Sequence, residues 1–345
     1  MVDKKKCNSL HRFILETLDP VHVGAGGYRI GRVDLSIVRE PGTRLPKLPG
    51  TGISGAVRHY ATIFYGKTIC AGQGRQDEGG KQAGHCGQNT CPICYTFGSV
   101  SGDRSFAGTV HIFDARLLFF PVYSTAGPVW VTCPDILLGL ELADESALNE
   151  VTDDKVLAGP KLCGYQYLNL GWLMVGVNNY REQKKEQSGS RELSLFNNLS
   201  CLPVPVKERC VVVSDTIFPH VVNSNLEVRT SVSIDPETGA AREGALFTYE
   251  AIPRAAFLWL DVLENDFRKN ENQKTWPVKK KVKYENQKWQ DNAGDSLPEA
   301  NIWETPIDVV KTGLEMMECM GVGGMATRGF GRIKNLGEVG INEKP

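Results

Sequence analysis

The order of the elements expected along this chain predicts an α+β protein with a ferredoxin-like (RRM-like) core that carries large insertions. The first half of the chain reads as a strand, an extended loop, a helix and a second strand. The last third reads as a β-hairpin followed by a helix and a strand. Segments between these groups are rich in Gly, Gln and charged residues, a composition typical of insertions. A chain of 345 residues is long enough for such a core.

The first group of core elements begins with an expected strand over residues 11–24. An extended, basic and proline-containing loop covers 27–50. The next segment, TGISGAVRHYATIFYG, predicts a helix because its apolar residues recur on one face, namely Ile53, Val57, Tyr60, Ile63 and Phe64. A strand is expected over 109–123, then a strand and a helix in VWVTCPDILLGL, and a further strand over 210–218.

The second group begins with a hairpin over 229–262. Its first strand alternates with a period of two, DPETG at 235–239 supplies the turn, and ALFTY leads the return strand. A helix is expected over 307–320, and RIKNLGEV predicts the strand after it.

These elements divide the chain into a core and its insertions. Two polar stretches, 178–195 and 265–305, are expected to be loops. The expected organisation is 1–66 and 106–177 as the first part of the core, 67–105 as a cysteine-rich insertion, 178–262 as an insertion with the hairpin, 263–305 as a basic loop, and 306–345 as the helix, glycine-rich loop and strand that complete the core.

Composition and charge limit the classes of protein to which the chain can belong. It has 41% hydrophobic and 23% charged residues, which is ordinary for a globular protein, and a formal net charge of −1. That charge argues against a protein that coats nucleic acid indiscriminately, although a local binding face stays possible. No apolar segment has the length of a signal peptide or a membrane span, so we expect a cytoplasmic protein with no membrane partner.

Clustered cysteines in the first insertion predict a structural zinc site. Cys91 and Cys94 form a Cys-x-x-Cys pair whose thiolates can both reach one ion about 2.3 Å away. Cys70 and Cys86 are the expected second pair, with His85 as an alternative to Cys86. Four protein ligands would close the shell, so the zinc would organise a segment too poor in apolar residues to fold alone. A redox Cys-x-x-Cys motif would need a thioredoxin-like context that is absent, and incidental thiols are the remaining alternative.

A glycine-rich stretch, GVGGMATRGFGR, directly follows the last expected helix at residues 321–332. Its backbone can approach a bulky partner closely and its arginines add positive charge, a combination that suits a phosphate chain. A dinucleotide-binding motif is excluded because it would lie between a strand and a helix in that order. An ordinary surface turn is the alternative. The candidate binding residues are Gly321, Gly323, Gly324, Arg328, Gly329 and Gly331.

Several motifs occur in an order that resembles the RAMP superfamily of CRISPR proteins. They span nearly the whole chain and include VHVGAGG, RVDLSIVRE, LPGTGISGAVRH, CPICYTFG, FDARLLFFPVYSTAGPVWVTCP, SIDPETGAAREGALFTYEAIP and the glycine-rich stretch. The resemblance is strongest to the repeated backbone subunit of type III RNA-guided effector complexes. The LLFFPV and WVTCP segments are similar to the Cmr-type subunit of type III-B, whereas CPICYTFG is similar to its Csm-type relative.

The resemblance implies a function. Copies of such a subunit stack head to tail along a CRISPR guide RNA, each holding about six nucleotides, in a complex with other type III subunits. A β-hairpin thumb, here expected within 217–247, flips one base out of the duplex between guide and target. A loop aspartate, which matches Asp34, then cuts the complementary target RNA with Mg²⁺ or another divalent metal.

The resemblance also implies residues that contact the guide RNA. His22 stands at the family's histidine position, and Arg39 and Arg58 are candidates for guide phosphates on an extended loop and at a helix start. The chain departs from the family at Ser54, where lysine often stands, so the expected contact falls to Arg58. The RNA-binding set outside the glycine-rich stretch is His22, Gly24, Gly26, Arg39, Thr51, Ser54 and Arg58.

Three other functions are weighed against this one. The same architecture could be a scaffold without catalysis. A guide-processing ribonuclease of the same superfamily would use His22 or His59 as general acid or base. An unrelated zinc-stabilised metabolic enzyme is disfavoured because the sequence offers no nucleotide-binding fold, nucleophile elbow or open metal site.

Overall fold

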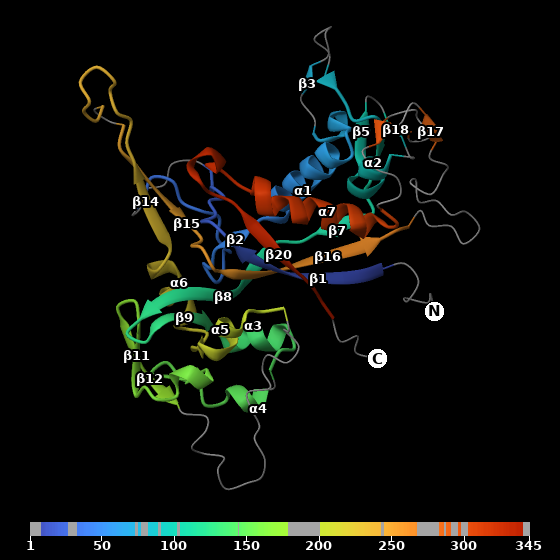
Figure 1. Ribbon diagram of the computed structural model, residues 1–345. Helices are drawn as coiled ribbons and strands as arrows, with labels where there is room; N and C mark the ends of the chain where they lie inside the picture. The colour runs from blue at the N-terminus through green and yellow to red at the C-terminus, as the bar shows by residue number, and fades with distance from the viewer. Residues whose placement is uncertain are drawn as a thin grey trace.

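A large mixed sheet organises the fold in a computed structural model of the chain, which confirms the α+β class (Figure 1). The sheet has 11 strands among the described residues, and its main path runs β11-β12-β10-β13-β9-β8-β16-β1-β20. The structure describes residues 8–26, 33–72, 75–76, 82–88, 91–101, 104–143, 145–178, 201–242, 245–267, 283–285, 288–290, 296–297 and 303–340.

Four antiparallel strands form one half of this sheet in the order β8-β16-β1-β20. They are β1 (Asn8–Thr17), β8 (Ala115–Ser124), β16 (Phe257–Asn265) and β20 (Ile333–Val339). Short strands β2 (Lys47–Leu48) and β7 (Val110–Ile112) pair with β8 and β16. Helices α1 (Gly50–Phe64) and α7 (Pro306–Met320) pack against each other and bury their apolar faces on this half.

The two core helices begin and meet at well-defined residues. Helix α7 starts with a capping box in which Thr305 and Asp308 satisfy each other's backbone N–H groups, with proline at the first helical position. The helices are in tight contact at Gly313, where an added Cβ would lie 2.5 Å from the Val57 side chain. Because a larger residue at this position would clash with Val57, the contact between α1 and α7 requires glycine there.

The other half of the sheet continues from β8 and contains both parallel and antiparallel pairs. Its strands are β9 (Gly127–Thr132), β10 (Lys155–Ala158), β11 (Tyr167–Leu170), β12 (Leu173–Asn178) and β13 (Cys210–Val212). The helical segments around it are α3 (Pro134–Gly139), α4 (Glu145–Leu148), η2 (Pro160–Leu162), α5 (Val204–Glu208) and α6 (Phe218–Ser224).

Two groups of elements stand out from this body (Figure 1). Strands β14 (Glu227–Ser231) and β15 (Phe247–Ala251) form a hairpin that projects at the upper left of the view. The cysteine-rich insertion lies beside α1 and α7 at the upper right and contains η1 (Thr68–Cys70), β3 (Arg75–Gln76), β4 (Gln82–Ala83), α2 (Pro92–Phe97), β5 (Ser99–Ser101) and β6 (Arg104–Phe106).

Most core elements lie where the sequence predicted them, including the helices α1 and α7 and the strand β20. The hairpin expected over 229–262 is present as β14 and β15 but ends at Ala251, because the residues from Phe257 onward form β16 of the main sheet. The strand expected over 11–24 ends at Thr17, shortly before Pro20, which has no N–H to donate. The strand expected over 109–123 is interrupted because Asp114 turns to accept hydrogen bonds from the Gly50 N–H and the Lys47 ammonium.

Two other expectations were partly wrong. Only the start of 210–218 is a strand, because a proline at the first turn of α6 redirects the chain into a helix. The loop expected over 265–305 contains the paired strands β17 (Lys283–Glu285), β18 (Lys288–Gln290) and β19 (Ser296–Leu297). The other expected loop lies, beyond Asn178, outside the described residues. Within the described ranges, no helix is long and apolar enough to cross a membrane.

Candidate functional sites

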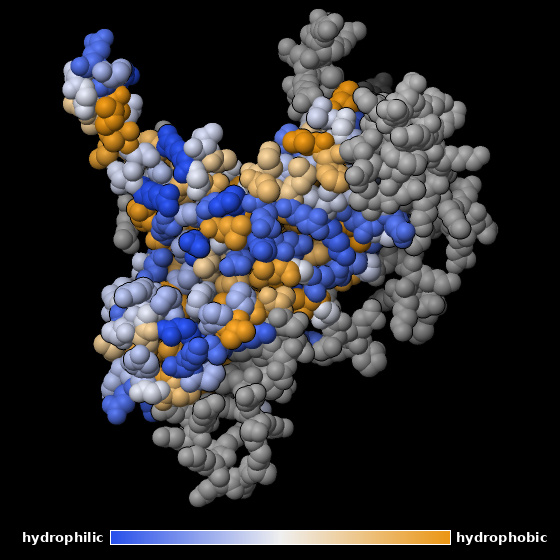
Figure 2. Space-filling model, in the orientation of Figure 1, coloured by the Kyte–Doolittle hydropathy of each residue, from blue (hydrophilic) through white to orange (hydrophobic). Residues whose placement is uncertain are grey.

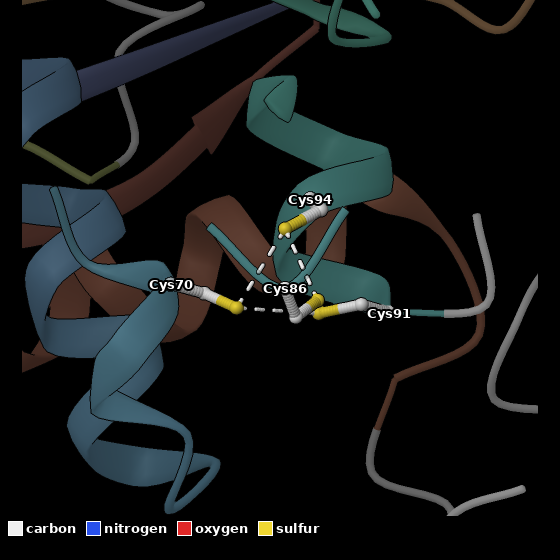
Figure 3. A group of neighbouring side chains, drawn as sticks. All are labelled: Cys70, Cys86, Cys91 and Cys94. Carbon is white, nitrogen blue, oxygen red and sulfur yellow. Dashed lines mark hydrogen bonds between the residues drawn. The ribbon is translucent and has the colours of Figure 1, made fainter. Parts of the chain in front are cut away.

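The four cysteines of the insertion meet at one point, and their side chains converge (Figure 3). The Sγ atoms of Cys70 and Cys86 each lie 3.6 Å from that of Cys94, and Cys70 Sγ lies 3.9 Å from Cys91 Sγ. A tetrahedral ion with Zn–S bonds of about 2.3 Å requires S–S distances of about 3.8 Å. The donor set therefore fits a tetrathiolate zinc ion.

Local structure places each cysteine. Cys91 caps the N-terminus of α2 and Cys94 lies within its first turn, while Cys70 ends η1. Cys86, rather than its neighbour His85, is the fourth member, because the Cys86 Sγ lies with those of the other three cysteines, all within 4.8 Å of one another, whereas His85 is not part of this group. Hydrogen bonding among the four thiols, chiefly with Cys70, lowers the pKa of Cys86 and of Cys94, while the same bonding raises the pKa of Cys70 and of Cys91. Metal binding would therefore have to displace protons from the cluster.

Arg58 lies against the cysteine site instead of at a helix start. It sits about two turns into α1, which begins at Gly50. Its Nε donates to the Cys70 carbonyl oxygen at 2.7 Å, and its Nη2 is buried without a hydrogen-bond partner in the described part of the chain. Burial lowers the pKa of Arg58, while the charges of the four cysteines oppose that shift. Its positive charge is thus available to balance a tetrathiolate site.

Asp34 lies in a second candidate site, at the foot of the projecting hairpin. Its Oδ2 accepts hydrogen bonds from the Thr248 N–H at 2.7 Å and from the Thr248 hydroxyl at 2.9 Å. In return, the Asp34 N–H donates to Thr248 Oγ1 at 3.2 Å. These bonds lower the pKa of Asp34, and its carboxylate is exposed. Asp34 is therefore an ionised carboxylate held on strand β15.

A buried polar network lies next to this carboxylate. Arg39 donates to the carboxylate of Glu250 and, through Nε, to Asn223 Oδ1 at 2.9 Å. His22 is only 6% exposed, and its Nδ1 lies 2.7 Å from the carbonyl oxygen of Glu250. Sequence reasoning missed Thr248 and Glu250. The signal was present in FTYE, where polar residues alternate with aromatic ones along an expected strand.

The glycine-rich loop packs on the same hairpin and on the segment that carries His22. A Cβ at Gly323 would lie 2.4 Å from the His22 carbonyl oxygen, and one at Gly331 would lie 2.6 Å from that of Val322. The close approaches that these glycines permit are thus made to the protein's own backbone. Gly329 has open space around its Cα.

The loop's side chains extend this packing. The rings of Phe330 and Tyr249 lie 5.5 Å apart, and the Arg328 guanidinium covers the ring of Phe247 at 5.2 Å. Arg332, in contrast, is paired with Asp19. Both arginines are exposed, but within the described ranges only Arg332 has a carboxylate partner.

The remaining candidates lie around these two sites. Thr51 is exposed in the first turn of α1, and Ser54 is half-buried one turn later. Gly24 bridges to Ile37, in the segment that carries Asp34, and Gly26 adopts a positive φ of 73°. The structure thus brings 20–26, 33–39, β15 and the glycine-rich loop together, whereas the cysteine site is separate.

The fold and sites define an α+β protein with a cluster of four cysteines that could hold a metal ion and an exposed carboxylate beside a projecting hairpin. A family model described as the RAMP superfamily matches residues 14–334. The chain belongs to this superfamily, as its motifs led us to expect.

Two sequence relatives are similar over part of the chain. The "CRISPR system Cmr endoribonuclease Cmr4" of Pyrococcus furiosus is 25% identical over 249 residues, which cover 69% of this chain and 76% of the relative. The "CRISPR system Cms endoribonuclease Csm3" of Methanothermobacter thermautotrophicus is 26% identical over 152 residues, which cover 41% of this chain and 56% of the relative.

Two solved structures share the fold. A subunit of the type III-B Cmr-beta complex bound to cognate target RNA is similar with a TM-score of 0.56 and 14% identity, over 95% of this chain and 97% of that one. Oligomeric Cmr4 from Pyrococcus furiosus is similar with a TM-score of 0.52 and 18% identity, over 95% and 99% of the two chains.

Proposed function

We propose that this chain is a guide-RNA-binding backbone subunit of a type III CRISPR effector complex of the Cmr type, and that it cuts complementary target RNA through Asp34 with a divalent metal such as Mg²⁺. In this proposal, copies of the chain stack head to tail along one guide RNA beside other subunits and cut at steps of about six nucleotides. The two sequence relatives are both described as CRISPR endoribonucleases, which supports the assignment.

The observation that carries the proposal is the exposed, ionised carboxylate of Asp34. Its Oδ1 accepts no hydrogen bond from another residue in the described ranges, so this oxygen can hold a metal ion or orient a ribose 2′-hydroxyl. A regular RNA helix does not present the 2′-hydroxyl in line with its phosphate. A hairpin that splays one nucleotide next to Asp34 would supply that geometry.

The β14–β15 hairpin is the proposed thumb. It projects from the body and carries both hydrophobic and hydrophilic surface (Figure 2). Three apolar side chains of the hairpin are exposed to water, which is energetically unfavourable: the exposed fractions of Val232, Ile234 and Leu246 are 42%, 54% and 65%. Insertion of such apolar side chains beside a base would explain their exposure.

The proposed core is ferredoxin-like and consists of β1, α1, β8, β16, α7 and β20. Their order along the chain and the strand order β8-β16-β1-β20 support this topology. The other segments would then be additions to this core, and the insertion expected over 178–262 would end before β16. Zinc is the proposed ion of the cysteine site, where it would cross-link the insertion and take no part in the cleavage.

We assign the RNA contacts to the exposed candidates. The first turn of α1 would offer backbone N–H groups and the exposed Thr51 hydroxyl to phosphates, with the half-buried Ser54 hydroxyl one turn further on. The same RNA backbone would also be contacted by Gly24, Gly26, Arg328 and the rest of the glycine-rich loop. His22 and Arg39 have protein partners at the Asp34 site, so they would support these contacts indirectly, whereas Arg58 supports the cysteine site.

The deciding experiment is cleavage of complementary target RNA by the reconstituted complex, with guide RNA and Mg²⁺, comparing the native chain with Asp34→Ala. The native complex should give a ladder of cuts about six nucleotides apart, and the variant should bind the target without cutting it. Asp154→Ala is the matched control, because Asp154 is an exposed aspartate bonded to the hydroxyl of Thr152 at 2.7 Å, away from the hairpin.

Other outcomes would support the alternatives. A ladder that persists in Asp34→Ala would make the chain a non-catalytic scaffold. Cleavage of precursor guide RNA by the chain alone, abolished by His59→Ala, would indicate a processing ribonuclease, because His59 is exposed whereas His22 is buried.

A further inference from the structure

We propose that Thr248 is the positioning residue for Asp34, and that its hydroxyl group fixes which carboxylate oxygen faces the RNA. The proposal rests on the proposed function, since it concerns the orientation of the carboxylate assigned to cleavage. It adds a residue on the hairpin to a site otherwise defined by the loop that carries Asp34.

The first argument is the pattern of hydrogen bonds. Both donors of Thr248, its N–H and its hydroxyl, converge on one oxygen of Asp34, Oδ2. The same hydroxyl accepts the Asp34 N–H, so each group of Thr248 that can bond to Asp34 does so. A carboxylate fixed through one oxygen cannot rotate freely. Oδ1 is thereby held in one direction for a metal ion or a 2′-hydroxyl.

The second argument is the backbone that carries the pair. Leu35 forms a parallel bridge with Tyr249, through hydrogen bonds from the Leu35 N–H to the Thr248 carbonyl and from the Glu250 N–H to the Leu35 carbonyl. The Asp34 segment is therefore attached to the edge of β15 by one parallel bridge. The Asp34 carboxylate and the hairpin consequently move as one unit.

The third argument is the direction of the side chains along β15. Phe247 and Tyr249 face the glycine-rich loop, as their contacts with Arg328 and Phe330 show. Side chains alternate between the two faces of a strand, so Thr248 points to the other face. The strand thus uses one face for packing and the other for orienting Asp34.

These arguments give the hairpin a second role. It would place a nucleotide and also aim the group that cuts beside it. Both tasks share one strand, so the position of the cut relative to the hairpin is fixed by covalent geometry and three hydrogen bonds. The two donors also favour the ionised form of Asp34 by lowering its pKa.

The test compares Thr248→Val, Thr248→Ser and Asp34→Ala in the assembled complex, under single-turnover conditions with Mg²⁺. Valine keeps the shape of threonine but lacks the hydroxyl, so we expect cleavage to slow by about tenfold while target affinity is unchanged. Serine restores the hydroxyl and should stay within about twofold of the native rate. Thr152→Val, which removes the same kind of bond from Asp154, is the matched control.

The outcomes separate this inference from the function on which it rests. If Asp34→Ala is inactive and Thr248→Val cuts at the native rate, Thr248 does not position Asp34. If serine is as slow as valine, the effect comes from packing and the inference is likewise overturned. If Asp34→Ala cuts at the native rate, the proposed function of Asp34 in cleavage is itself wrong. Thr248→Ala, which also lacks the hydroxyl, replaces the valine variant if that one does not assemble.

Discussion

The cysteine site and the Asp34 site are built in opposite ways. The four cysteines come from one stretch, Cys70 to Cys94, and three of them are buried. The Asp34 site is assembled from four segments spread along nearly the whole chain, and its carboxylate is exposed. A buried site of like ligands is recognisable from local spacing. A site formed by strand pairing depends on the tertiary fold.

The two sites also need different support. A tetrathiolate site concentrates negative charge in a buried place, which makes the nearby cation of Arg58 valuable. An exposed carboxylate needs no such compensation, because water screens it. What it lacks is a fixed direction, which the bonds from Thr248 supply.

The contrast between the two sites is tested most directly by removing one cysteine from the buried site. We expect Cys94→Ser to lose its zinc and to make the insertion sensitive to protease, because a structural zinc ion contributes roughly 10 kcal/mol to the folding of its site. Metal analysis of the purified chain and limited proteolysis would measure both effects. Cys319→Ser, at an exposed cysteine, should change neither. A native chain that contains no zinc would refute the prediction.

A smaller effect is expected at Arg58, which joins α1 to the cysteine site. Arg58→Gln should lower the free energy of unfolding by about 1–3 kcal/mol, because the buried Cys70 carbonyl loses a charged donor. Guide RNA affinity should stay the same. Denaturant unfolding would test the predicted loss of stability, and an RNA-binding titration would test the predicted affinity. A loss of affinity at unchanged stability would instead assign Arg58 to the phosphates.

The titration of Asp34 tests whether the hydrogen bonds from Thr248 support its carboxylate. Hydrogen bonds from Thr248 lower the pKa of its carboxyl group, so the stabilisation from these bonds is full above the unfolded pKa and disappears as pH falls through the lower folded value. Carbon NMR of labelled aspartate, with Asp34→Asn to assign the signal, should record titration below about pH 3.9. In Thr248→Val the same signal should titrate at a higher pH. A signal unchanged between the two chains would contradict the prediction.

The smallest effect is expected at Arg328, the arginine of the glycine-rich loop that covers Phe247 of the hairpin. Arg328→Ala should weaken RNA binding a few-fold and reduce the salt slope of log affinity by about one, as expected for one lost phosphate contact. Arg332→Ala is the control in the same loop, because Arg332 is already paired with Asp19. An equal loss in both variants would indicate general attraction by the loop's charge.

These differences explain how much of the fold and of the two sites could be predicted from the sequence. The α+β class, the two core helices and the hairpin followed from periodicity, because each depends on residues close together in the chain. The cysteine set followed from Cys-x-x-Cys spacing. The choice between His85 and Cys86 did not, because it depended on which of the two side chains the fold brings within reach of the other three cysteines.

The rest of the candidate site was less accessible. Asp34 came from a motif resemblance, and nothing in the residues around it indicated Thr248, which lies far away in the chain. Arg58 was expected at a helix start, but its partner is the Cys70 carbonyl, an atom that no spacing identifies. The glycine-rich loop was expected to approach a ligand, and most of its tight contacts are instead with the segment around His22.

The central position of β1 has a consequence for how the chain is made. This first strand lies between β16 and β20, which the ribosome completes late or last. Strands β8, β9, β13, β10, β12 and β11 can pair with one another much earlier. During synthesis β1 must therefore wait with both of its edges unpaired, a state that favours association with other chains. Folding of this half should be slow, because contacts between distant segments form late. A chain released before β20 should keep the β9–β13 half and leave β1 open along one edge.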